Sequence, residues 1–160
     1  HGHDRPRQER SLAGDPQHSD PNKRGNVKGG AAFACPDGLA FDQRGALWIQ
    51  TDSSAASMAG KDWVNIGNNQ MLAADPSTGE VRRFLTGPPG CEITAIILTP
   101  DGRQMFINIQ HPGEGPRPHP ARTDPANRKA VSAWPDGAAG EGPRSATIVI
   151  RRTDGGLIGL

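Results

Sequence analysis

The stretch that decides the fold is Cys35-Pro-Asp-Gly-Leu-Ala-Phe-Asp-Gln-Arg-Gly-Ala-Leu-Trp-Ile-Gln-Thr-Asp52. Leu39 and Phe41 alternate with smaller residues, which is the period of a half-buried strand. The turn that follows ends at Gly45, a residue that readily adopts positive φ. Residues 47–49 are rich in strand-forming side chains. The stretch therefore predicts a β-hairpin.

The hairpin has two acidic residues, Asp37 and Asp52, at its outer ends. Because a hairpin brings these ends together, we expect both carboxylates at one edge of the sheet. The same strand–turn–strand pattern recurs over residues 91–111, where Gly102 corresponds to Gly45. Repetition of a short-strand unit is typical of propeller blades. Two unrelated hairpins are the alternative.

Two further strands follow each hairpin in the sequence pattern. Pro and Gly punctuate the turns between them, as in residues 75–79 and 153–156. The pattern therefore predicts an all-β fold of two four-stranded antiparallel meanders with long loops, about two blades of a β-propeller. These additional strands are expected at residues 69–74, 80–85, 145–150 and from 157 to 160.

The domain organisation follows from these units. Residues 1–34 are polar and turn-rich, and we expect a loop or the end of a preceding blade there. The first blade is expected at 35–87. The second is expected at 88–160, with a Pro- and Gly-rich loop insertion at 111–144. The lack of further blades and of a leader sequence suggests a fragment of a larger propeller.

Composition excludes some classes of function. The 160 residues carry a formal net charge of +1, which gives no case for nucleic-acid binding. No apolar run approaches the roughly 20 residues needed to span a bilayer. Gly (21) and Pro (15) are frequent, which fits many turns between short strands.

Polar side chains of the metal-ligand type concentrate at one edge of the predicted sheets. In a meander, the start of the first strand, the end of the second and the start of the third share that edge. Polar capping of strand ends is the alternative explanation. The residues expected at the edge are Cys35, Asp37, Asp52, Asn68, Asn69, Cys91, Glu92, Thr94, Asn108, Gln110, His111 and Glu114.

A series of motifs, in order, resembles the C-terminal part of the PhoX-type alkaline phosphatases. The resemblance runs from about Leu12 to the end of the chain. The motifs are Cys35-Pro-Asp-Gly-Leu-Ala-Phe-Asp42, Leu47-Trp-Ile-Gln-Thr-Asp52, Gly67-Asn-Asn-Gln-Met-Leu-Ala-Ala-Asp-Pro76, Arg83-Phe-Leu-Thr-Gly-Pro88, Gly90-Cys-Glu-Ile-Thr94, Thr99-Pro-Asp-Gly-Arg103, Phe106-Ile-Asn-Ile-Gln-His-Pro-Gly-Glu114 and Trp134-Pro-Asp-Gly137.

This resemblance implies a β-propeller enzyme that is exported, and hence periplasmic or secreted, and that hydrolyses phosphate monoesters. It also implies calcium and iron as cofactors at the propeller centre. Hard cations need carboxylates, and clustered cations neutralise the charge that develops on phosphate oxygens. Asp37 and Glu92 are the first candidates for metal ligands because they begin the two innermost strands. Asp52, His111 and Glu114 are the second.

The resemblance leaves the catalytic residues unassigned, because they are expected in earlier blades. We therefore expect the chain to contribute metal ligands yet to be inactive alone, and to self-associate through exposed strand edges. Lys23 and Arg24 could contact phosphate, or lie in a solvated loop. A non-catalytic β-repeat binding module and a calcium-dependent lactonase-like hydrolase are the alternative functions. For Cys35 and Cys91, a disulfide, buried free thiols and ligation of iron by one cysteine all stay open.

Overall fold

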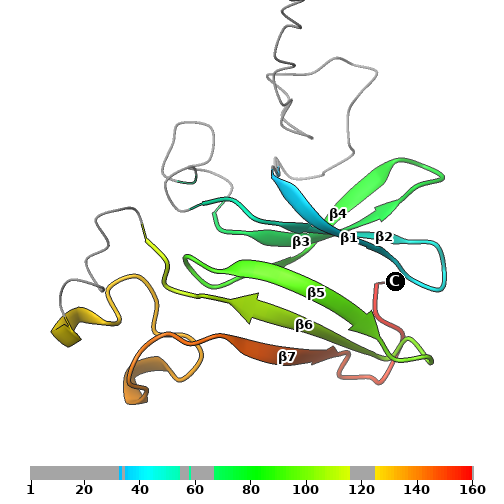
Figure 1. Cartoon of the computed structure of the whole chain (residues 1–160). Coiled ribbons are helices and arrows are strands. Elements are labelled where there is room, and N and C mark those ends of the chain that lie inside the picture. Colours follow the sequence, from blue (N-terminus) through cyan, green and yellow to red (C-terminus); the bar gives the residue numbers. More distant parts are fainter. Residues whose placement is uncertain (1–32, 34, 55–57, 59–66, 116–124, 160) are drawn as a thin grey trace, which may run out of the picture.

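The structure is a computed structural model that describes residues 33, 35–54, 58, 67–115 and 125–159. It contains two antiparallel sheets, one above the other (Figure 1). In each sheet the order of the strands in space follows the order in the chain. The first sheet consists of β1 (Pro36–Phe41), β2 (Leu47–Thr51), β3 (Gln70–Asp75) and β4 (Glu80–Thr86). The second consists of β5 (Glu92–Leu98), β6 (Gln104–Gln110) and β7 (Ala146–Arg151).

The all-β class and the two successive antiparallel meanders are thus confirmed. The second sheet, however, has three strands among the described residues, and the strand expected from residue 157 does not form. Instead the chain turns back, and the amide of Ile158 donates to the carbonyl of Gly102 at 3.0 Å. The Ile158 side chain is buried in the core. The chain therefore buries Ile158 instead of adding a fourth strand beside β7.

Part of the expected 111–144 loop has local structure. Two short 3-10 turns occur at Pro125–Asn127 and Gly137–Ala139. Residues 116–124 of that loop lie outside the described residues, as does the N-terminal segment up to residue 32, which includes Lys23 and Arg24. Within the described part of the chain, no helix is long and apolar enough to cross a membrane.

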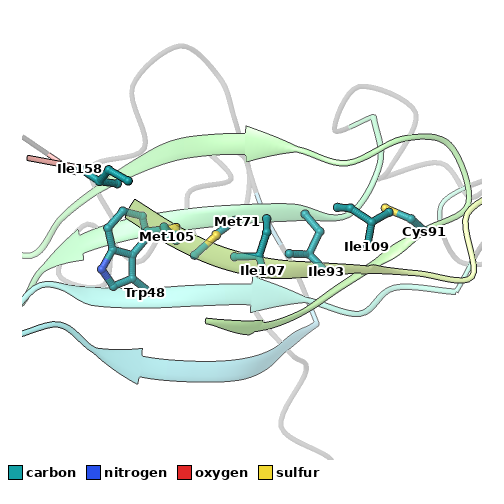
Figure 2. Packing of buried hydrophobic residues seen from close by; sticks show 8 residues of the cluster. All are labelled: Trp48, Met71, Cys91, Ile93, Met105, Ile107, Ile109 and Ile158. Atoms are coloured by element: carbon teal, nitrogen blue, oxygen red, sulfur yellow. The ribbon is translucent and has the colours of Figure 1, made fainter. Parts of the chain in front are cut away.

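The main core lies between the two sheets (Figure 2). Trp48 and Met71 contribute from the first sheet, and their side chains have no exposed surface. Burying each large apolar side chain stabilises the fold by about 1.5–3 kcal/mol. The second sheet and its flanking segments supply Cys91, Ile93, Met105, Ile107, Ile109 and Ile158.

The first strand buries a different face from the one that its pattern suggested. Ala40 pairs with Trp48, so Ala40 shares the core-facing side of the sheet. Leu39 and Phe41 therefore point to the opposite side, where they are 63% and 69% exposed. The alternation was predicted correctly, but the apolar residues of β1 are largely exposed rather than half-buried.

Candidate metal centre

The predicted polar edge exists, because strand ends from both sheets meet there. Pro36 pairs with Thr51 at the open end of the first hairpin, and the amide of Asp52 donates to the carbonyl of Cys35 at 3.0 Å. In the second sheet, Glu92 pairs with Gln110. Contacts of β5 with both β1 and β2 bring the two open ends together. Local turn chemistry makes each hairpin, and sheet packing joins their ends.

His111 is the central side chain of this edge. Its Nε2 lies 3.3 Å from Glu92 Oε2, and its Nδ1 lies 3.2 Å from Glu114 Oε2. The Nδ1 atom is also 3.4 Å from the carbonyl oxygen of Gly90. The imidazole therefore links a carboxylate at the start of β5 to one in the loop after β6.

The backbone at His111 adopts an unusual conformation that holds the ring in this place. Its φ is +37°, a region that residues other than glycine rarely occupy. The amide of His111 donates to Ser145 Oγ at 2.9 Å, and the amide of Glu114 donates to the His111 carbonyl at 3.2 Å. Strain of this kind persists only where surrounding contacts enforce it, and it is frequent at functional sites.

The pKa of the Glu92 carboxyl group is shifted by its surroundings at the edge. Its side chain is buried, with 8% of the residue exposed. This burial raises its pKa, and the negative charge of Asp52 raises it further. The interactions with His111 oppose the shift, while Asp37 adds a smaller increase. Asp37 and Asp52 are therefore close enough to Glu92 to repel its charge, and a bound cation would relieve that repulsion.

The five candidate ligands are brought to one edge, but they do not converge on one point. His111 contacts Glu92 and Glu114 with opposite ring nitrogens, so the ring keeps these two carboxylates apart. Asp37 and Asp52 affect the pKa of Glu92 through their negative charges rather than through a direct contact. Across the described ranges, no group of three His, Cys, Asp or Glu side chains is close enough to hold an ion.

The two cysteines are both free, so no disulfide joins Cys35 to Cys91. Burial raises the pKa of the Cys91 thiol to about 12, although a hydrogen-bond contact with Asn68 opposes the shift. The Cys91 side chain is fully buried and packs in the hydrophobic core between the sheets. The structure favours the free-thiol alternative for Cys91, while Cys35 is only half-buried.

A cavity of about 650 Å³ lies beside His111 and was not anticipated from the sequence. The loop between the described residues 125 and 145 folds back to form its far wall, with Arg144 held by Asp136 at 2.8 and 3.0 Å. Its charged and polar lining residues are His111, Glu114, Arg128, Glu141, Arg144 and Ser145. Only the length of the loop hinted at such a feature.

A family model described as alkaline phosphatase PhoX matches residues 8–113 of the chain. Among solved structures, Pseudomonas fluorescens PhoX in complex with vanadate, a transition state analogue, is similar, with 43% sequence identity and a TM-score of 0.71. The similarity covers 92% of this chain and 23% of the Pseudomonas chain. No curated protein matches. The matched residues include β1, β2 and the Glu92–His111 pair, and on these grounds the chain belongs to the PhoX family of alkaline phosphatases.

Proposed function

We propose that the chain supplies part of the metal-binding edge of an enzyme that hydrolyses phosphate monoesters. The observation that carries the proposal is the linked set Glu92–His111–Glu114 in a chain that belongs to the PhoX family. The match to a protein solved with vanadate, a transition state analogue, supports phosphoryl chemistry. The chain spans 23% of the length of that relative, so the remaining groups of the site must come from residues outside it.

The side-chain types of the edge are those that calcium prefers, although they do not converge on one point in the described part of this chain alone. Calcium takes six to eight oxygen ligands, and carboxylates are the commonest charged ones. Asp37, Asp52, Glu92 and Glu114 provide such oxygens. Ser53 adds a second observation, because its buried Oγ has no hydrogen-bond partner among the described residues. An unsatisfied oxygen on the residue after Asp52 and carboxylates whose negative charges act on one another both favour a cation.

Fewer side chains of the edge are suited to bind iron. His111 offers a nitrogen ligand, whereas the Cys91 thiol packs in the hydrophobic core rather than at the polar edge. Because both imidazole nitrogens lie near carboxylates, His111 would bind iron only after giving up one of these contacts. We therefore assign calcium to this edge first.

The residues of the chain have distinct roles in this proposal. Asp37, Asp52, Glu92 and Glu114 would hold a calcium ion together with groups from outside the chain, and that ion would neutralise charge on phosphate oxygens. His111 orients Glu92 and Glu114 relative to each other. The chain alone is inactive, and the protein that contains these residues acts in the periplasm or outside the cell. Detection of the protein in the periplasmic or extracellular fraction would support this location, and confinement to the cytoplasm would refute it.

The test compares the chain alone with a chimera in which it replaces the corresponding segment of the Pseudomonas fluorescens protein. We expect the chimera to hydrolyse p-nitrophenyl phosphate in a calcium-dependent manner and the chain alone to be inactive. Glu92→Gln in the chimera should abolish most activity, while Glu80→Gln on β4, away from the edge, should not. Full activity of the Glu92→Gln chimera would overturn the proposed role of the edge.

The same chimera distinguishes the alternative functions. Hydrolysis of a lactone without hydrolysis of the phosphomonoester would favour the lactonase-like enzyme. A folded, calcium-free and inactive chimera would favour the non-catalytic module. Metal content and the two hydrolysis assays on one preparation therefore separate all three.

We also propose that the isolated chain self-associates. Leu39 and Phe41 on β1, and Ile97 on β5, are each more than 60% exposed. Large exposed apolar groups on sheet surfaces favour association, and unpaired strand edges add hydrogen-bonding groups. If the purified chain sediments as a monomer at every protein concentration tested, this proposal is wrong.

A further inference from the structure

Asn69 connects the two halves of the polar edge. The residue precedes β3 and is 3% exposed. On one side its Oδ1 accepts hydrogen bonds from Thr51 Oγ1 at 3.0 Å and from the Ser53 amide at 2.7 Å. On the other side its Nδ2 donates to the carbonyls of Ser53 at 2.9 Å and Cys91 at 2.8 Å. One buried side chain thus bonds to both sheets.

The bonds of Asn69 use the whole capacity of its amide. An asparagine side chain has two donor hydrogens and an oxygen with two lone pairs. The four contacts occupy all of them. A fully satisfied buried amide is rigid, because any rotation would leave a donor or an acceptor without a partner.

The partners of Asn69 are adjacent to two candidate ligands. Thr51 and Ser53 flank Asp52, and Cys91 immediately precedes Glu92. Among the described residues, the hydrogen bonds of the Asn69 amide go to these neighbours and not to Asp52 or Glu92 themselves. The amide therefore holds the side chain of Thr51 before Asp52, the backbone of Ser53 after it, and the backbone of Cys91 next to Glu92.

Neighbouring bonds tie Asn69 in turn to the rest of the corner. Its carbonyl accepts from the Gly87 amide at 2.9 Å, and Thr51 Oγ1 accepts from the Gln70 amide at 2.8 Å. The preceding residue, Asn68, accepts from the Gly90 amide at 3.0 Å. Asn69 is the member of this group whose side chain reaches both the end of β2 and the start of β5.

We propose that Asn69 is a positioning residue that sets the relative placement of the Asp52 and Glu92 backbones for metal binding. The inference rests on the proposed function for its metal and on the hydrogen bonds above for its geometry. Because Asp52 and Glu92 are far apart in the sequence, their backbones need a constraint of this kind to stay near each other. The amide of Asn69 supplies the constraint without adding charge.

The experiment compares Asn69→Ala and Asn69→Ser with Gln70→Ala, in both the chain and the chimera. Gln70 is the matched control because it is an equally buried amide on the next position, and its Oε1 accepts from Arg83 within the first sheet. Calcium affinity is measured by titration calorimetry on folded protein. Loss of a group that orients metal ligands typically weakens metal affinity 10–100-fold. We expect about that loss for both Asn69 variants and less than about a twofold change for Gln70→Ala.

Amide hydrogen exchange gives a readout that needs no metal. Without calcium, we expect the Asp52 amide and the Glu92 amide both to exchange faster in the Asn69 variants than in the wild type. Both amides should keep their wild-type exchange rates in Gln70→Ala. If no wild-type preparation binds calcium, the proposed function fails, and this exchange pattern alone tests the positioning role. Wild-type calcium affinity or wild-type exchange at Glu92 in folded Asn69→Ala would overturn the inference. Asn69→Ser supplies the same test if the alanine variant does not fold.

Discussion

Gly90 lies directly against the backbone of Glu114, so that a Cβ atom at position 90 would overlap the Glu114 carbonyl and amide. Gly90 also has a φ of +71°, which only glycine adopts without strain. The close approach docks the loop after β6 onto the start of β5. It thereby places Glu114 beside His111.

Gly90→Ala should destabilise the fold and separate Glu114 from the edge. Strain at positive φ and overlap with backbone atoms together cost about 2–4 kcal/mol. Gly79→Ala is the matched control, because its φ is +70° and a Cβ there would meet nothing within 4 Å. It should cost only about 1 kcal/mol. Chemical denaturation measures both values, and equal losses would show that the contact with Glu114 does not matter.

Glu92→Gln should separate stability from metal binding. Burial and the charge of Asp52 disfavour the ionised carboxylate, so its pKa is raised in the folded protein. Removing the charge should therefore leave the metal-free protein equally stable or more stable. A ligand at 100 times its Kd stabilises a protein by about 2.7 kcal/mol.

That calcium-dependent gain should be largely absent from Glu92→Gln and intact in Glu80→Gln. Thermal melts with calcium and with chelator measure it. An unchanged calcium effect in Glu92→Gln would remove Glu92 from the ligand set.

Asp42 should stabilise the fold in a pH-dependent manner. Burial alone would raise its pKa, but hydrogen bonds from the Arg44 amide, the Trp48 indole and the Ala46 amide outweigh this, and the pKa is lowered below 3.8. Because the folded pKa is lowered, the ionised group contributes stability above the unfolded pKa. The contribution is lost as the pH falls below 3.8 through the folded value.

Asp42→Ala should therefore cost about 1–3 kcal/mol near neutral pH, since the Trp48 Nε1 that bonds to Asp42 Oδ2 at 3.2 Å loses its acceptor. The cost should shrink as the pH falls below 3.8. Asp75→Ala, which removes an exposed turn carboxylate, should cost less at neutral pH. Denaturation of both variants across pH measures this difference, and a pH-independent cost for Asp42→Ala would contradict the role of its charge.

Leu39→Ser combined with Phe41→Ser should weaken self-association of the isolated chain. The two side chains are largely exposed on the side of the first sheet opposite the main core, so their removal takes apolar area mainly from the surface. We expect the variant to sediment as a smaller species at equal concentration with an unchanged melting temperature. Gln43→Ser, an exposed change in the adjacent turn, should not alter the sedimentation. Identical behaviour of all three proteins would show that this face is not the contact.

Local turn chemistry made the hairpins predictable from the sequence. Aspartates in the turns make local bonds: Asp42 Oδ1 accepts from the Arg44 amide at 2.9 Å, and Asp75 Oδ1 accepts from the Ser77 amide at 2.8 Å. These bonds join residues two positions apart, so a short stretch of sequence contains all that they need. The shared edge of Asp37 and Asp52 followed from the same hairpin geometry.

The sequence by itself thus determined the strand periods, the turns and the edge on which the candidate ligands lie, because these depend on neighbours along the chain. Only the tertiary structure decided that Ile158 packs between the sheets instead of starting a strand, that His111 links Glu92 to Glu114, and that Asn69 joins both sheets. Each of these depends on groups far apart in sequence. Their placement is set by competition for burial and for hydrogen-bond partners, which exists only once the two sheets have packed together.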